Sequence, residues 1–381
     1  MNDLMKTETF GDRGLAFALT GLGGSNAFGA GFLQAALDHK VEPGIITCTS
    51  GMIYWTWRYL EALRVPQEDR TGRLRREFGA AIAPAEVFPK SVDVLNDVNL
   101  LTRGVPGIFR WARPEYFARF LTAPFFSLSV PLSEALQNLF LPSQWLVPLR
   151  PKADFERMAK AFNDAAIGVC FNSFETESGV EYLHANGPAR KMLAREEERM
   201  KKANVAKPST FAENAGKAPW RSLPEKVEAD IDELAVEDAL WLTLYGPHGN
   251  VERGAPANRI DGAYFRSVIL SELTMVDAVL IPRPVSSARP AFPLNWFEAQ
   301  DFQTELWWNA SFAPQAAAIG FVNRLVDNEL LTSGGFKRVE LVPIEIDVDR
   351  GFFLYFREDL ETFDRGYNEA QVHRLGSKVA A

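Results

Sequence analysis

A serine at a strand-to-helix turn has a setting that suits nucleophilic chemistry. Ser50 lies between an apolar run that predicts a strand, residues 44–50, and an amphipathic run that predicts a helix, residues 52–63. Such a turn lifts the hydroxyl above a sheet, and the positive end of the helix favours negative charge on a substrate. The turn alone leaves two interpretations open, because serine is also a preferred helix N-cap.

A glycine-rich loop precedes this turn. Residues 21–24 read Gly-Leu-Gly-Gly, between a predicted strand over 15–21 and a predicted helix over 28–39. Parallel strands end at one edge of a sheet, so we expect the loop beside Ser50, where its N–H groups would form an oxyanion hole. A dinucleotide site is disfavoured, because Asn26 stands in place of the third glycine and the second strand ends without a carboxylate. A nucleotide-binding oxidoreductase remains the weaker alternative.

A serine nucleophile needs a base, and the candidate is a carboxylate. Asp261 lies just before a glycine turn in the run RIDGAYF, residues 259–265. None of the four histidines lies in a triad context: His39, His184, His248 and His373.

Together these segments resemble the patatin-like phospholipase family, which uses a Ser–Asp dyad without a histidine base. Residues 21–26 and 31–33 lie on its glycine-rich first motif. Residues 48–52 lie on its Gly-x-Ser-x-Gly motif, and residues 261–263 match its Asp-Gly-Ala motif. The resemblance spans residues 13–290.

The resemblance implies a three-layer α/β/α fold with a mainly parallel sheet, in one domain over residues 1–381. Residues 291–381 are similar to the C-terminal part of longer bacterial members, and we expect them to pack on the same domain.

The chemistry that the resemblance implies is ester hydrolysis through an acyl-enzyme, with a fatty-acyl lipid or other acyl ester as substrate. Ser50 would be the nucleophile and Asp261 the base, and no cofactor or metal would be needed. The oxyanion hole would be formed by backbone N–H groups of Gly21, Gly23, Gly24 and Gly51.

Several residues depart from the family pattern. Leu22, Ser25 and Asn26 alter the first motif, and Cys48 and Met52 replace both glycines that flank the serine turn. Met52 is large where strand and helix crowd closely, so we expect it either to splay them or to point elsewhere. The departures leave a second function class open, a catalytically impaired protein of this fold that binds lipid or a protein partner.

Composition limits the remaining classes. The chain has 381 residues and a net charge of −8, which argues against nucleic-acid binding. Its two cysteines, Cys48 and Cys170, are too few for a disulfide framework. The sequence begins without a secretory signal and contains no apolar run long enough to span a membrane, so a cytoplasmic protein is expected. The oligomeric state stays open.

Two segments differ from the rest in composition. Residues 84–150 are apolar and interrupted by prolines, which indicates core, the wall of an acyl pocket or a cap in peripheral contact with a membrane. Residues 187–233 are highly charged, which predicts a surface insertion away from the sheet. Further strands are expected over residues 166–178, 277–285 and 338–347, and helices over 235–246, 297–333 and 357–374.

Overall fold

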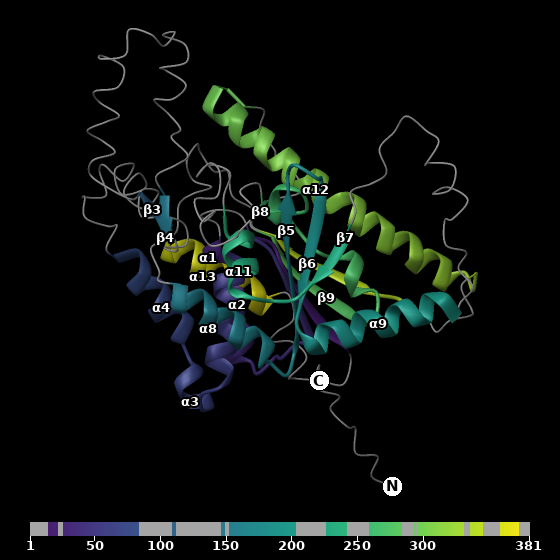
Figure 1. Cartoon of the computed structure of the whole chain (residues 1–381), viewed down its shortest axis with the longest axis horizontal. Helices are drawn as coiled ribbons and strands as arrows, with labels where there is room; N and C mark the ends of the chain where they lie inside the picture. Colours follow the sequence, from purple (N-terminus) through teal and green to yellow (C-terminus); the bar gives the residue numbers. More distant parts are fainter. Residues whose placement is uncertain are drawn as a thin grey trace.

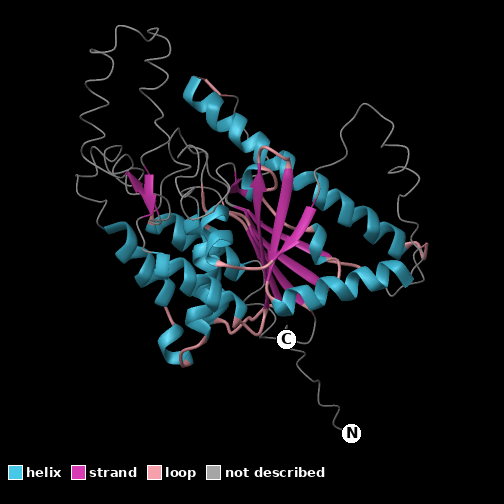
Figure 2. Cartoon of the chain, viewed as in Figure 1, coloured by secondary structure: helices cyan, strands magenta, loops and turns pink. Residues whose placement is uncertain are grey.

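The structure, a computed structural model, is shown in Figures 1 and 2. It describes residues 14–21, 26–83, 109–111, 146–148, 152–202, 226–241, 259–283, 293–294, 296–330, 336–345 and 359–372. Most of the apolar segment predicted over 84–150 lies outside these residues. From its middle and end the structure describes β3 (Phe109–Trp111) and β4 (Leu146–Pro148), which pair as a separate antiparallel sheet.

An eight-stranded sheet forms the centre of the described chain (Figure 2). Seven of its strands lie in the order β10-β9-β1-β2-β5-β6-β7, and β8 pairs with β5. The strands are β1 (Leu15–Leu19), β2 (Ile45–Cys48), β5 (Gly168–Glu175), β6 (Val180–Ala185), β7 (Lys226–Ala229), β8 (Arg259–Asp261), β9 (Ala278–Arg283) and β10 (Glu340–Glu345).

Most neighbouring strands are parallel. β1 pairs in parallel with β2 and β9, and so do β2 with β5, β9 with β10, and β6 with β7. The two antiparallel pairs in this sheet both involve β5, which pairs with β6 and with β8. The expected α/β class with a mainly parallel sheet is confirmed. The strand order reverses at β1, and open α/β sheets bind ligands at the carboxyl ends of strands beside such a reversal.

Helices cover both faces of the sheet (Figure 2). One face carries α1 (Asn26–Asp38), α2 (Met52–Leu63), α4 (Arg73–Ile82), α8 (Lys152–Asn163), α11 (Glu233–Ala239) and α13 (Leu360–Ala370), with the short α3 (Gln67–Arg70) between α2 and α4. The other face carries α9 (Gly187–Lys202) and α12 (Trp296–Asp327). Successive strand residues supply the two cores, since Phe17 packs in the first and Ala16 in the second.

The C-terminal helix α13 packs closely on α1. A Cβ atom on Gly31 of α1 would lie 1.9 Å from the Phe363 carbonyl oxygen, and one on Gly366 of α13 would lie 2.0 Å from that of Phe28. Only glycine fits at either position. Gly31, which belongs to the first motif in the sequence, is therefore a helix-packing residue.

Of the charged segment 187–233, the structure describes residues 187–202 and 226–233, and these attach to the sheet, whereas residues 203–225 lie outside the described residues. Helix α9 packs on the second face through Ala189, Met192 and Leu193, and β7 adds a strand beside β6. Helix α11 ends at Ala239, earlier than predicted. Among the described helices, none contains a stretch long and apolar enough to cross a bilayer.

Candidate active site

Ser50 lies on a strained turn between β2 and α2. Its φ angle is 51°, in the left-handed region that residues other than glycine rarely adopt. The turn is held by hydrogen bonds from the Thr49 N–H to the Leu19 carbonyl (3.2 Å) and from the Ile53 N–H to the Ser50 carbonyl (2.9 Å). Gly51 is the N-cap of α2, and no side chain caps this helix. Ser50 is therefore not a helix cap, which removes the simpler interpretation of the turn.

Strand β5 sets the distance between the two candidate catalytic residues. β2 ends with Cys48 paired to Phe171, and β8 ends with Asp261 paired to Ser173. The two strands run in opposite directions along β5, so their carboxyl ends approach each other. Their last pairings lie two residues apart, about 7 Å along the strand. The Ser50 turn leaves β2 within this interval.

The Asp261 side chain is buried, with 1% of its surface exposed. Its backbone N–H donates to the Trp241 carbonyl (2.9 Å), and its Oδ1 accepts from the Ala263 N–H (2.8 Å) at the start of η7 (Gly262–Tyr264). Burial raises the pKa of Asp261 to about 7. A carboxyl group with this pKa can exchange a proton near neutral pH.

Ser50 contacts this carboxyl group twice. Its hydroxyl and its backbone N–H both lie close enough to Asp261 to lower the carboxyl pKa, against the larger effect of burial. Asp261 Oδ2 is buried and accepts no hydrogen bond of ordinary geometry from the described residues. The hydroxyl is thus near the carboxylate but not yet well aligned, as is common before a substrate binds. The structure brings together the two residues that the sequence proposed as a dyad.

The position after Asp261 has room only for glycine. A Cβ atom at this position would lie 2.3 Å from Cγ of Asn172. Asn172 also donates from Nδ2 to the Gly262 carbonyl (3.2 Å). The Asp-Gly pair therefore places the chain that carries Asp261 directly against β5.

Two of the proposed oxyanion donors can be located. The Gly21 N–H donates to Thr49 Oγ1 (3.0 Å), so in this structure it is not presented to a substrate, which corrects the prediction for Gly21. Gly51 is the N-cap of α2 and follows Ser50 directly. Its N–H makes no backbone hydrogen bond within the described chain. Gly23 and Gly24 lie outside the described residues.

The N-termini of two helices meet beside Ser50. A Cβ atom on Gly51 would lie 2.1 Å from Nδ2 of Asn26, the first residue of α1. Helices α1 and α2 thus direct their positive ends to the same place. The combined dipoles favour a negative charge at Ser50.

The two departures from the family pattern at the serine turn, Cys48 and Met52, fit into the core without forcing strand and helix apart. Met52 is fully buried and lies over Gly29 of α1, where a Cβ atom would be 2.5 Å from its Sδ. Met52 therefore points toward α1. This agrees with the expectation that it points away from the crowded space between strand and helix. Cys48 is buried, its Sγ lies 3.7 Å from the Cys170 carbonyl, and burial raises its thiol pKa to about 12. Such a thiol is not a nucleophile near neutral pH.

A second serine contacts a histidine, whereas Ser50 makes no such contact with the histidines in the described part of the chain, His39 and His184. Ser173 Oγ lies 2.9 Å from Nε2 of His184, whose Nδ1 lies 3.1 Å from the Asp230 carbonyl. Burial lowers the pKa of His184 to about 4. Ser173 is fully buried within a strand and has no turn that would lift its hydroxyl toward a substrate. This pair is therefore a core contact.

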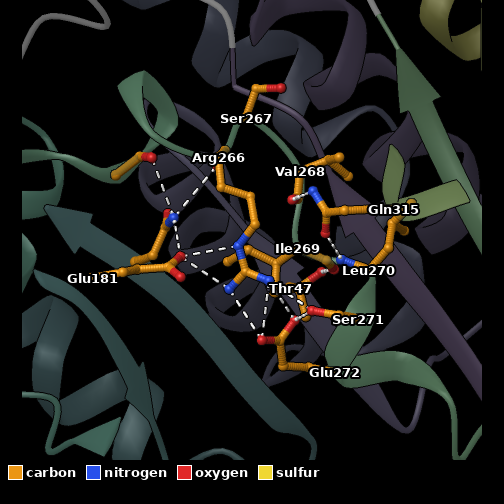
Figure 3. Close-up of polar contacts among 12 residues, drawn as sticks. Thr47, Glu181, Arg266, Ser267, Val268, Ile269, Leu270, Ser271, Glu272 and Gln315 are labelled. Carbon is orange, nitrogen blue, oxygen red and sulfur yellow. Dashed lines mark hydrogen bonds and ion pairs between the residues drawn. The ribbon is translucent and has the colours of Figure 1, made fainter. Parts of the chain in front are cut away.

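Sequence reasoning missed the segment that holds Asp261 in place. Arg266 is partly buried. It donates to Glu181 (3.0 Å) and to Glu272 (2.8 Å), and so ties the chain after Asp261 to β6 and to η8 (Ser271–Leu273) (Figure 3). Gln315 of α12 donates to the Val268 carbonyl (2.8 Å) and accepts from the Leu270 N–H (3.0 Å). These contacts join residues distant in sequence, and no local pattern signals them.

A comparison of the chain with models of known protein families finds no match, and a comparison with curated proteins finds none. The site therefore has to be interpreted from its own geometry.

Proposed function

We propose that the protein is a serine acyl hydrolase of the patatin-like type, which hydrolyses fatty-acyl esters with Ser50 as nucleophile and Asp261 as base. The observation that carries the proposal is the contact of the Ser50 hydroxyl with the buried Asp261 carboxyl group, whose pKa is about 7. A strained serine turn, a neighbouring carboxylate and two converging helix N-termini are the parts that acyl transfer requires.

Acylation begins when ionised Asp261 accepts the Ser50 hydroxyl proton. Ser50 Oγ then forms a bond to the ester carbonyl carbon, and the carbonyl oxygen becomes an oxyanion. As this intermediate collapses, the ester C–O bond breaks and the proton passes from Asp261 to the leaving alcohol. In deacylation, a water molecule gives a proton to Asp261 while its oxygen forms a bond to the acyl carbon, and the bond between that carbon and Ser50 Oγ then breaks. The carboxylic acid leaves, and the proton returns to Ser50.

The Gly51 N–H and the positive ends of α1 and α2 support the oxyanion role of the serine turn. Gly23 and Gly24 remain proposed donors on the family resemblance alone. The alternative of a catalytically impaired protein rested on the departures at the serine turn, Cys48 and Met52. The support from Met52 is weakened because Met52 lies over Gly29 while Ser50 keeps its positive φ.

An apolar substrate agrees with the residues that follow the base. Phe265 stacks on Phe174 with ring centroids 4.9 Å apart, and Tyr264 stacks on Trp307 of α12 at 5.7 Å. Trp307 and its neighbour Leu306 are both exposed. An apolar acyl chain is stabilised by aromatic surface of this kind.

The test is hydrolysis of p-nitrophenyl butyrate by the wild-type chain and two variants. Ser50→Ala and Asp261→Asn should each lower turnover on the order of 1,000-fold or more, because nucleophile and base act as a unit. Ser173→Ala is the matched control and should keep its activity. A folded wild-type protein without esterase activity would favour the lipid- or protein-binding alternative. If Ser173→Ala lost as much turnover as Ser50→Ala, the assignment of Ser50 as the nucleophile would be wrong.

A further inference from the structure

The side chain of Thr49, the residue before the proposed nucleophile, joins three separate segments. Its Oγ1 accepts a hydrogen bond from the Gly21 N–H (3.0 Å) and donates one to the Ser267 carbonyl (2.8 Å). Gly21 follows β1, and Ser267 lies six residues after Asp261 in the chain that carries the base. Thr49 is fully buried, so water cannot replace either bond.

The close packing around Thr49 leaves these segments little freedom. A Cβ atom on Gly21 would lie 2.0 Å from the Thr49 carbonyl oxygen and 2.6 Å from Cβ of Ser50. On its other side, the Ser267 N–H donates to Ser311 Oγ of α12 (2.9 Å). The chain at Ser267 is thus held between α12 and Thr49, the residue before the proposed nucleophile.

Thr47 provides a natural comparison. It lies in β2, two residues before Thr49, is also fully buried, and donates to the Ile269 carbonyl (2.8 Å) (Figure 3). The two threonines therefore hold carbonyls two residues apart on one segment. Thr47 lies farther from Ser50 and has no bond to Gly21 within the described chain.

We propose that Thr49 is a positioning residue, whose hydroxyl sets the approach of Asp261 to Ser50. The inference rests on the proposed function for its effect on rate. Removal of the hydroxyl leaves the Gly21 N–H and the Ser267 carbonyl buried without this partner, and both groups must move to find others. Such movement shifts the base relative to the nucleophile, whereas loss of the Thr47 hydroxyl frees only the Ile269 carbonyl.

The test compares Thr49→Val, which keeps the shape and removes the hydroxyl, with Thr49→Ser and Thr47→Val. Thermal unfolding first shows which variants fold, and Thr49→Cys replaces the valine variant if that one does not. We expect Thr49→Val to lower kcat on the order of 100-fold with little change in KM, because displaced reacting groups cost this much. Thr49→Ser should stay within about threefold of wild type, and Thr47→Val should keep kcat despite a similar loss in Tm.

A second readout does not depend on activity. The pKa of the Asp261 carboxyl group can be measured from its carbon-13 shift through a pH titration, with Asp261→Asn used to identify the signal. It should rise in Thr49→Val, because the Ser50 groups that lower it withdraw, and should stay unchanged in Thr47→Val. An unchanged pKa in Thr49→Val, or equal loss of kcat in both valine variants, would overturn the inference. A wild-type chain without esterase activity in which Thr49→Val still raises this pKa would overturn the proposed function alone.

Discussion

The hydroxyl and the backbone N–H of Ser50 both lie against the carboxyl group of Asp261. The two residues come from distant parts of the sequence, and β5 brings them together by pairing with the ends of both β2 and β8. Burial raises the Asp261 pKa toward neutrality, and the Ser50 contacts oppose this rise. The carboxyl group can therefore accept the Ser50 proton and return it within the same pH range.

The rate of ester hydrolysis should depend on pH through Asp261. Only the ionised carboxylate is a base, so kcat/KM should fall about tenfold per pH unit below a pKa near 7. A pH–rate profile with a stable, uncharged ester measures this limb. A profile that stays flat down to pH 5 in the folded protein would exclude Asp261 as the base.

The same pKa has a consequence for stability. The folded-state pKa of Asp261 lies above its ordinary value of 3.8, so the folded state loses stability as pH rises between that value and about 7. Asp261→Asn removes this loss. Thermal or urea unfolding should show the asparagine variant more stable than wild type, with an advantage that grows from pH 5 to pH 8 on the order of 1–3 kcal/mol. The same advantage at both pH values would contradict the raised pKa.

The backbone of Ser50 should make glycine the more stable replacement. A Cβ atom at a φ of 51° costs about 1 kcal/mol, which glycine avoids. Ser50→Gly should therefore unfold at higher urea than Ser50→Ala, although both lack the nucleophile. Ser173 lies in a strand without a positive φ, so there the order should reverse. Alanine more stable than glycine at both positions would show that the serine turn is not strained.

Met52 and Gly29 should behave as a coupled pair. A Cβ atom on Gly29 would lie 2.5 Å from Met52 Sδ, so Gly29→Ala should cost about 1–3 kcal/mol of unfolding free energy. Adding Met52→Ala to this variant should recover part of the loss, as a double-mutant cycle measures.

The single variant Met52→Gly should lose stability through the cavity it leaves, and it should gain no esterase activity. A clear gain in activity would mean that Met52 does distort the serine turn.

Local patterns in the sequence were enough to predict most elements around the site. Hydrophobic periodicity predicted the strand–helix alternation of residues 15–63, including helix α2 with its observed bounds. In the segment 187–233, the many charges mask the few apolar residues that attach α9 to the sheet, Ala189, Met192 and Leu193. Hydrophobic periodicity indicates which side of a single element faces the core. It does not indicate whether a mostly polar helix such as α9 is needed to cover a face of the sheet.

The site was predictable only where glycine, serine and aspartate mark local geometry. The serine turn and the Asp-Gly step have such marks, whereas the hydroxyl of Thr49 and the side chain of Arg266 act on residues far away in the sequence. Gly21 illustrates the same limit. Its position beside Ser50 followed from the two predicted parallel strands, but the partner of its N–H depended on the side chain of Thr49, which follows β2.

Covalent labelling by a fluorophosphonate tests the central claim most directly, because it reports the nucleophile without any assumption about substrate. Mass spectrometry of the digested wild-type chain should find one adduct, on Ser50. Ser50→Ala should give none, and Asp261→Asn should react much more slowly at the same residue. Absence of an adduct on the folded wild-type protein, or an adduct on another serine, would contradict the Ser50–Asp261 dyad.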